Sequence, residues 1–344
     1  MAINWTQATL PAAAAGKRIE EIAFNGARFV AVGDIILHST DGKAWAMAPA
    51  TVPAGQVLYE VVWTGAQFVA MGDNIYGYSS DGLTWTFANL AETDGAFTDL
   101  ASNLKGVVIG TNSASNAYYS SGASFRYVQY SANDGLTFAR RSTAGAVDTN
   151  ASRSGTQISH TQRTRFLGGQ FVSVGHNLDF DMGTNTQAIC TSPDGLAWTR
   201  RESGAPPGDV VYLYDVAWNG AMYLATSQQY TYSSPSGVTW TRLNTNLGPS
   251  LRLESMAAVP DGFVAVTRSA PQAAQKTAFS LDGKAWSLIS DSTDALAYRD
   301  VFYADNRIIA VGSGSTGPVI AYADYSSAPP LFWSNRIDCT ETVR

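Results

Sequence analysis

Short apolar runs alternate with turn residues along almost the whole chain. Runs rich in Val, Ile, Phe, Tyr and Trp are separated by turns that usually contain Gly, as in EIAFNGARFVAVG from Glu21 and DVAWNGAMYLATS from Asp215. Short β-branched and aromatic runs bounded by Asn-Gly or Asp-Gly turns predict antiparallel strands joined by hairpins. The pattern therefore predicts an all-β fold.

A second pattern closes most groups of strands. It is a turn of Ser, Asp or Asn, Gly and an aromatic residue, and its copies are STDGKAW (39–45), SSDGLTW (79–85), SANDGLTF (131–138), SPDGLAW (192–198), SPSGVTW (234–240) and SLDGKAW (280–286). They recur roughly every 40 to 60 residues, a spacing typical of a four-stranded propeller blade. A seventh apolar unit from Asp300 has no such turn. The repeat predicts a seven-bladed β-propeller of four-stranded antiparallel blades.

The two ends of the chain are predicted to share the last blade. The ring is expected to span residues 1–324, with 1–8 as the outer strand of the closing blade, because INWT resembles the strand that follows the other turns. Such closure pairs strand edges that would otherwise promote aggregation. Residues 325–344 form a C-terminal tail in which a Pro-Pro pair precedes Leu331, Phe332 and Trp333. Two interpretations stay open: the tail docks on its own ring, or it attaches the protein to a partner.

The composition narrows the classes of function. Charged residues make up 15% of the 344 residues and the formal net charge is -6, which argues against binding to nucleic acid or anionic membranes through a global basic field. Gly (31), Trp (9) and Tyr (16) are plentiful, which suits many strands and tight turns and excludes helical bundles and coiled coils. We see no signal peptide and no membrane anchor, so synthesis in the cytoplasm without membrane insertion is expected. Cys190 and Cys339 are expected to be free thiols.

The six turns resemble the Asp-box, Ser-x-Asp-x-Gly-x-Thr-Trp, of sialidases and of many propellers without enzymatic activity. SANDGLTF has the full spacing, the other copies lack one residue before Gly, and Ser236 replaces the acid in the fifth copy. The resemblance implies a folding device in which Ser and Asp cap backbone donors, Gly takes the left-handed conformation and Trp fills the blade. The Arg-Ile-Pro segment of sialidases is absent. The resemblance is therefore to the non-enzymatic branch of BNR/sialidase-like propellers.

Loop lengths predict which face of the ring binds a ligand. With strands A to D running outward from the centre, A–B and C–D turns share one face, and B–C and D–A connections share the other. All large insertions lie on the second face, here called the long-loop face, at residues 112–129, 142–162, 176–188 and 268–276. Binding residues concentrate on loops held by a rigid scaffold. The candidate ligand-binding residues are Tyr118, Tyr119, Phe125, Arg126, Tyr127, Arg153, His160, Arg163, Arg165 and His176. Their rings and guanidinium groups suit a saccharide or a protein surface, and packing of these loops on one another is the alternative.

Two acidic patterns are candidates for ion binding. Asp179, Asp181 and Asn185 alternate around Gly183 as calcium ligands do, although the same alternation fits one face of an extended arm. A second set recurs near the start of the innermost strands and is predicted to ring the mouth of the central channel: Glu21, Glu60, Asp99, Asp215, Glu254 and Asp300. These carboxylates either hold a cation or cap backbone donors of a neighbouring blade.

No catalytic constellation emerges from the sequence. The three histidines, His38, His160 and His176, belong to no Ser-His-Asp, Cys-His or clustered-His pattern. The low-charge composition and long aromatic loops resemble, in style, bacteriophage tail propellers. We expect a non-catalytic virion protein of the tail tip or fibre that recognises a host-surface glycan or receptor protein and contacts other tail proteins through residues 325–344. No cofactor apart from calcium is expected. The alternatives are a glycan-processing hydrolase with carboxylates on the long-loop face and an assembly-factor propeller.

Overall fold

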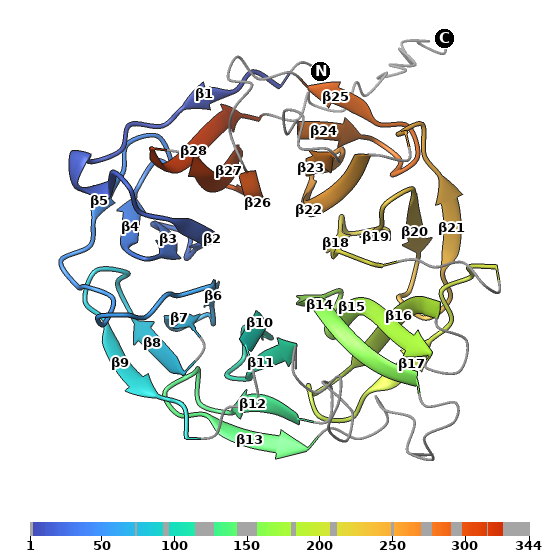
Figure 1. Ribbon diagram of the computed structural model, residues 1–344, viewed down its shortest axis with the longest axis horizontal. Helices are drawn as coiled ribbons and strands as arrows, with labels where there is room; N and C mark the ends of the chain where they lie inside the picture. The colour runs from blue at the N-terminus through green and yellow to red at the C-terminus, as the bar shows by residue number, and fades with distance from the viewer. Residues whose placement is uncertain are drawn as a thin grey trace, which may run out of the picture.

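Seven small sheets make up the molecule. The computed structural model describes residues 3–72, 74–91, 96–113, 127–142, 157–179, 184–206, 212–248, 251–269, 277–289, 298–314 and 316–325. These ranges form seven four-stranded antiparallel sheets, arranged radially about a central axis (Figure 1). The helical content of the same ranges is one short turn, η1 (Ala12–Ala14). The seven-bladed β-propeller predicted from the repeat is confirmed.

The strands of each blade follow one another in chain order from the centre outward, except in the closing blade. The strands of blades one to three are β2 (Ile19–Phe24), β3 (Phe29–Gly33), β4 (Ile36–Ser39), β5 (Ala46–Met47); β6 (Glu60–Trp63), β7 (Phe68–Met71), β8 (Ile75–Ser79), β9 (Thr86–Asn89); β10 (Ala96–Ser102), β11 (Val108–Ser113), β12 (Tyr127–Ser131), β13 (Ala139–Ser142). Those of blades four to six are β14 (Gln157–Leu167), β15 (Gln170–Asp179), β16 (Thr184–Ser192), β17 (Thr199–Arg201); β18 (Asp215–Trp218), β19 (Tyr223–Thr226), β20 (Tyr230–Ser234), β21 (Thr241–Asn244); β22 (Leu251–Val259), β23 (Gly262–Ser269), β24 (Thr277–Ser280), β25 (Ser287–Ile289).

The closing blade joins the two ends of the chain. Its strands are β26 (Tyr298–Ala304), β27 (Arg307–Gly314), β28 (Gly317–Asp324) and the N-terminal β1 (Thr6–Gln7), in the order β26-β27-β28-β1. Thr6 pairs with Tyr322 in the antiparallel register, which confirms the predicted closure. Trp5 adds a bond to the preceding blade, because its indole N–H donates to the Thr277 hydroxyl at 2.8 Å.

The recurring turn between the third and fourth strands joins one blade to the blade before it. In blade one the Ser39 hydroxyl accepts the Gly42 N–H at 2.8 Å, and the Asp41 carboxylate accepts the Lys43 and Ala44 N–H groups at 2.8 and 3.0 Å. Gly42 has φ of +67°, and a Cβ atom there would lie 2.7 Å from a side-chain carbon of Ile309 in the closing blade. Gly is therefore required both by its backbone conformation and by the close approach of two blades.

The third copy of the turn uses a different acceptor. In SANDGLTF the Asn133 side-chain oxygen accepts the Thr137 N–H at 3.1 Å, and Asp134 takes the left-handed conformation with φ of +59°. The amide therefore replaces the carboxylate that four of the other copies use, and the extra residue is absorbed by Asp134.

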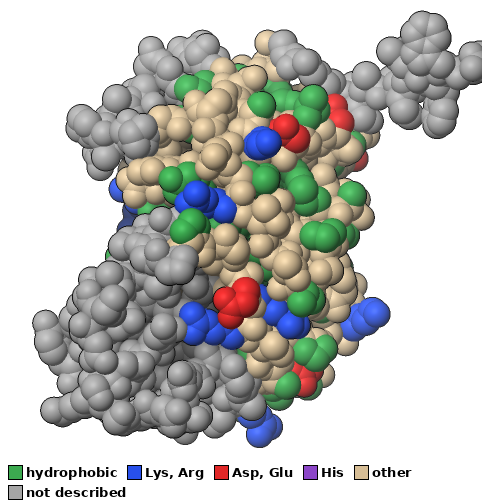
Figure 2. All heavy atoms as spheres, turned by 90° about the vertical axis from the view of Figure 1, so that its right-hand side faces the viewer, with side chains coloured by type: hydrophobic (Ala, Val, Ile, Leu, Met, Phe, Trp, Pro, Cys, Tyr) green, Lys and Arg blue, Asp and Glu red, His purple; other side chains and the backbone are tan. Residues whose placement is uncertain are grey.

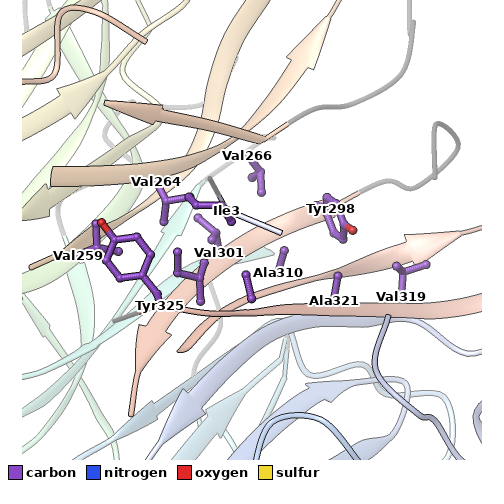
Figure 3. Packing of buried hydrophobic residues seen from close by; sticks show 12 residues of the cluster. Ile3, Val259, Val264, Val266, Tyr298, Val301, Ala310, Val319, Ala321 and Tyr325 are labelled. Carbon is purple, nitrogen blue, oxygen red and sulfur yellow. The ribbon is translucent and has the colours of Figure 1, made fainter. Parts of the chain in front are cut away.

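The hydrophobic core lies between neighbouring blades. Figure 3 shows one such layer, in which Val264 and Val266 of blade six pack against Val301 and Ala310 of the closing blade. Ile3 lies in the same layer. Each sheet thus buries both faces, and the ring depends on every blade having two neighbours.

Connection lengths differ between the two faces as predicted. A–B turns such as Phe24 to Phe29 and all C–D turns are short, whereas the long connections, such as Ser113 to Tyr127, join B to C or D to A. Two predicted loops are shorter than expected, because β14 begins at Gln157 and because β15 and β16 stay paired as far as Asp179 and Thr184. In both segments backbone pairing extends the strands into residues that the sequence analysis assigned to loops.

Candidate functional site

One position of the innermost strand is equivalent in all seven blades. It is the residue paired with the same place on the second strand, namely with Val32, Met71, Thr111, Val174, Thr226, Val266 and Val311. The residues at this position, here called ring residues, are Glu21, Glu60, Asp99, Arg163, Asp215, Ser255 and Asp300. The predicted acidic set is therefore correct at five positions. Glu254, the sixth residue of the predicted set, lies one residue before this position, and Ser255 holds the ring position of blade six.

The residue before each ring residue forms a β-bulge. In five blades the register slips by one residue at this point, and in the other two the N–H groups of Tyr59 and Tyr214 donate to the carbonyls of Met71 and Thr226, which already face the ring residues. The seven residues, here called bulge residues, are Glu20, Tyr59, Thr98, Gln162, Tyr214, Glu254 and Arg299. They lie one residue nearer the long-loop face. Bulges redirect side chains and are common beside functional sites.

Ring residues cap backbone donors of the next blade. The carboxylate of Asp99 accepts the Thr164 N–H, and that of Asp215 accepts the Met256 N–H at 2.7 Å. Each donor is the residue that follows the ring residue of the next blade. The capping interpretation of the acidic residues is thus confirmed at Asp99 and Asp215, and it explains why an acceptor recurs at this place.

Arg163 is the exception among the ring residues and contacts five of the others. Its Nη1 atom lies 3.3 Å from a carboxylate oxygen of Glu21, 3.3 Å from one of Glu60 and 3.4 Å from one of Asp99. Other atoms of its guanidinium approach Asp215 and Asp300 at 3.8 and 3.9 Å. Its side chain is 13% exposed. The guanidinium of Arg163 therefore contacts one ring carboxylate from each of five other blades.

Arg165 joins Arg163 at the centre of the ring. We call these two arginines and the carboxylates around them the central cluster, with the members Arg163, Arg165, Glu21, Glu60, Asp99, Asp215 and Asp300. Arg165 binds Asp215 through two bonds, Nε to Oδ1 at 2.9 Å and Nη2 to Oδ2 at 3.0 Å. Both arginines belong to β14, the innermost strand of blade four, so their prediction as loop residues available to a ligand was wrong. The sequence insertion before blade four ends earlier than expected, and the inner strand takes both residues into the centre of the ring.

The central cluster is buried and holds more carboxylates than guanidinium groups, and these two causes raise the pKa of some of its carboxyl groups. Burial raises the pKa of Glu21, and the Asp300 carboxylate beside it raises that pKa further. Burial and Glu21 raise the pKa of Glu60 in the same way. Burial alone would also raise the pKa of Asp215, but Arg165 and Arg163 outweigh burial and lower it. Within the described ranges no group of His, Cys, Asp or Glu side chains is arranged to hold a metal ion.

Bulge residues of blades five and six form a second, half-exposed cluster. The Arg252 guanidinium lies over the Tyr214 ring, 4.9 Å from its centroid. Glu254, 29% exposed, pairs with Nε of Arg252 at 2.7 Å and with Nη1 of Arg268 at 3.4 Å. We call Tyr214, Arg252, Glu254 and Arg268 the mouth cluster. It combines an aromatic ring, donors and an acceptor in fixed geometry on a sheet scaffold.

A further contact joins the bulge residues of the closing blade and blade one. Nη1 of Arg299 lies 2.8 Å from a carboxylate oxygen of Glu20. The His176 and Tyr212 rings lie 4.4 Å apart between centroids. His176 is thus a predicted ligand-binding residue that packs beside an aromatic ring.

The remaining predicted site residues have no described side chains. Tyr118, Tyr119, Phe125, Arg126, Arg153 and Asp181 lie outside the described ranges. Tyr127, His160, Asp179 and Asn185 belong to strands β12, β14, β15 and β16. The register pairs Asp179 with Thr184 and Asn185 with Leu178, which favours the extended arm over a calcium loop. Calcium binding stays a prediction.

Sequence reasoning missed the bulge residues. Tyr59, Tyr214 and Arg299 each stand immediately before a recurring acidic residue, and this offset was the available signal. The acidic residue recurs with the repeat, whereas its predecessor differs from blade to blade. In a repeat protein, positions that recur in every repeat usually stabilise the fold, whereas positions that vary between repeats are available to bind a ligand.

Comparisons with known proteins agree on the fold. No protein-family model and no curated protein matches this chain. Among solved structures, YCF48 bound to a D1 peptide is 14% identical, with a TM-score of 0.64 over 94% of this chain and 97% of that one. The extracellular domain of a putative one-component system from B. thetaiotaomicron is 12% identical, with a TM-score of 0.63 over 94% of this chain and 40% of that one. Catalytically inactive virginiamycin B lyase from Staphylococcus aureus with quinupristin is 8% identical, with a TM-score of 0.65 over 93% of this chain and 99% of that one.

These likenesses show a seven-bladed propeller and leave the function open. The similar structures include a peptide-bound protein, an extracellular domain and a lyase, so the fold alone does not decide between binding and catalysis. No helix of the described ranges combines the length and apolar character of a membrane span.

Proposed function

We propose that the protein is a non-catalytic binding protein whose ligand contacts the centre of the long-loop face. The carrying observation is the contrast between two adjacent positions of the inner strands. Ring residues are buried and bonded to neighbouring blades, whereas bulge residues vary in chemistry, and Gln162 and Arg299 among them are exposed. The inner position stabilises the ring and leaves the outer one free to recognise a ligand.

The mouth cluster suits a saccharide. A half-exposed Arg268 offers guanidinium donors, Glu254 offers acceptor oxygens, and Tyr214 offers a ring. Sugars are bound by aromatic faces together with charged groups that hydrogen-bond to hydroxyls. Since the carboxylate and guanidinium groups already hold one another in place, little conformational entropy is lost on binding.

We further propose that the chain is an Asp-box-type propeller of a bacteriophage virion, at the tail tip or fibre, with a host-surface glycan as ligand. The Ser and Asp hydrogen bonds of the turns support the first part, because they recur at Ser79 and Asp81, at Ser192 and Asp194, and at Ser280 and Asp282. The surface of the rim, on which charged and apolar side chains are mixed, supports the role in a virion. Figure 2 shows Lys and Arg, Asp and Glu, and apolar side chains interspersed over the rim. Other tail proteins are the proposed partners on the opposite face.

The test is binding of labelled protein to bacterial cells and to their extracted surface polysaccharides. Arg268→Ala is expected to weaken binding about tenfold, the effect of one lost charge-assisted contact, with an unchanged melting temperature. Lys284→Ala is the matched control, because Lys284 is exposed on the opposite face. Equal binding by Arg268→Ala and wild type would remove the mouth cluster from the site. Shortening of the polysaccharide would overturn the non-catalytic proposal in favour of a hydrolase.

A further inference from the structure

Tyr325 fixes the chain on the face opposite the long loops. The pairing of Ile308 with Ala323 corresponds to that of Phe263 with Ser280 in blade six, so Tyr325 falls where Asp282 stands in the blade-six turn. Its ring is 1% exposed and packs in the last core layer beside Val259 (Figure 3). Tyr325, which the sequence analysis assigned to the C-terminal tail, thus packs in the core of the propeller.

Two hydrogen bonds tie Tyr325 to neighbouring A–B turns. Its N–H donates to the carbonyl of Asn306 at 2.7 Å in the closing blade, and its hydroxyl donates to the Asp261 carboxylate in blade six. The rings of Phe279 and Tyr303 lie 6.4 and 5.9 Å away between centroids. Whatever follows Tyr325 starts from this face, at the junction of blades six and seven.

The most exposed large apolar side chain reported in the described ranges stands beside this junction. Leu281 is 65% exposed. Its Cα atom lies 3.0 Å from the place where a Cβ of Gly262 would be, and Gly262 follows Asp261, the partner of Tyr325. The equivalent positions in the other five turns carry small or polar residues or proline: Thr40, Ser80, Ala132, Pro193 and Pro235. Blade six alone among these turns presents a large apolar residue, next to the point where the chain leaves.

We propose that the segment after Tyr325 folds back onto the same face and packs Leu331, Phe332 and Trp333 against Leu281 and the A–B turn of blade six. Leu331 is the sixth residue after Tyr325, and six residue steps of extended chain can span about 20 Å. Pro329 and Pro330 restrict this connection, which lowers the entropy lost on docking. The short tether also gives the segment a high effective concentration at Leu281, which favours it over a second copy of the chain in dilute solution.

Trypsin cleavage after Arg336, read in the full-length protein, tests this proposal. Docking of the nearby residues 331–333 would prevent the bond after Arg336 from entering the active site of trypsin. Release of peptide 337–344 is therefore expected to be slow in the wild type. Leu281→Ser and Trp333→Ser should each speed that release about tenfold, and the double variant should add little to either single change. Leu104→Ser is the matched control, because Leu104 is 59% exposed on the same face at blade three and should leave the rate unchanged.

The thiol of Cys339 gives a second reading. Cys190 is 3% exposed, and burial raises the pKa of its thiol to about 12, so a thiol reagent labels Cys339 first. Labelling of Cys339 should be slow in the wild type and in Leu104→Ser, and faster in Leu281→Ser and Trp333→Ser. Wild-type rates equal to those of the urea-unfolded chain, and unchanged in Leu281→Ser, would overturn the proposal. Protection that grows with protein concentration would overturn it in favour of a second copy of the chain.

Discussion

The ring residues and the bulge residues stand next to one another in sequence and differ in almost every physical respect. Asp215 is fully buried and bonded to Arg165 and to the next blade, whereas Arg299, at the bulge position of the closing blade, is 57% exposed. One position has the same kind of side chain in five blades of seven, and the other changes from blade to blade. The comparison teaches that a one-residue register shift separates the part of the repeat that builds the ring from the part available for recognition.

The largest effect is expected from removing the central guanidinium. Arg163→Ala leaves Glu21, Glu60 and Asp99 buried without their shared partner, and such a loss costs about 3–5 kcal/mol of unfolding free energy. Urea unfolding measures it. Arg299→Ala removes a guanidinium that is 57% exposed and has Glu20 as its ion-pair partner, so it should cost less, about 1–2 kcal/mol. Adding Glu60→Gln to Arg163→Ala should restore part of the loss, because it removes one uncompensated charge. Equal costs for the two arginines would break the comparison.

The next effect is on the pH dependence of stability. Because the folded-state pKa of Glu60 is raised above its ordinary value of 4.5, its contribution is fully present below that value and is lost as pH rises through the raised pKa. Asp215, with a lowered pKa, acts in the opposite direction and only in the acid range below 3.8. Glu60→Gln should therefore make the decline above about pH 5 shallower, by up to about 1.4 kcal/mol per pH unit. Unfolding midpoints between pH 5 and 9 measure this, and an unchanged slope would contradict the raised pKa of Glu60. Glu202→Gln, at an exposed position, is the control.

The smallest expected effect on stability concerns Ser255 and Glu254, which are neighbouring residues of blade six. The Ser255 hydroxyl donates to Asp300 at 2.6 Å and accepts the Val301 N–H at 3.4 Å, so Ser255→Ala should cost about 1–2 kcal/mol. Glu254→Ala should change stability by less than about 0.5 kcal/mol and should weaken ligand binding. The opposite result, with Glu254 the more important for stability, would restore Glu254 to the ring and reverse the register argument.

Much of the fold could be read from the sequence because it is repeated. The six turn copies together with the apolar unit from Asp300 gave the blade count, the N-terminal INWT gave the closure, and the distribution of insertions gave the long-loop face. The candidate site was read only in part. The acidic set was found from its recurrence, but Glu254 was placed one residue wrongly, because a bulge leaves no mark in the sequence when both neighbours are polar. Arg163 was assigned to a loop, because its blade carries a cation where the others carry an acid and so broke the pattern that identified them.

The sequence by itself determined the architecture, because strand length, turn chemistry and repeat spacing are local properties that recur from blade to blade. The tertiary structure decided what the inner residues do. Five carboxylates from five blades meet Arg163 only because the ring brings together positions as far apart as Glu21 and Asp300, and their pKa values depend on that meeting. It also decided that Tyr325 belongs to the ring, because its burial comes from Asp261 and Asn306, which lie far from it or across a turn. Side-chain charge can be read from a sequence, whereas the burial and partners that give a charge its effect arise only when distant strands pack.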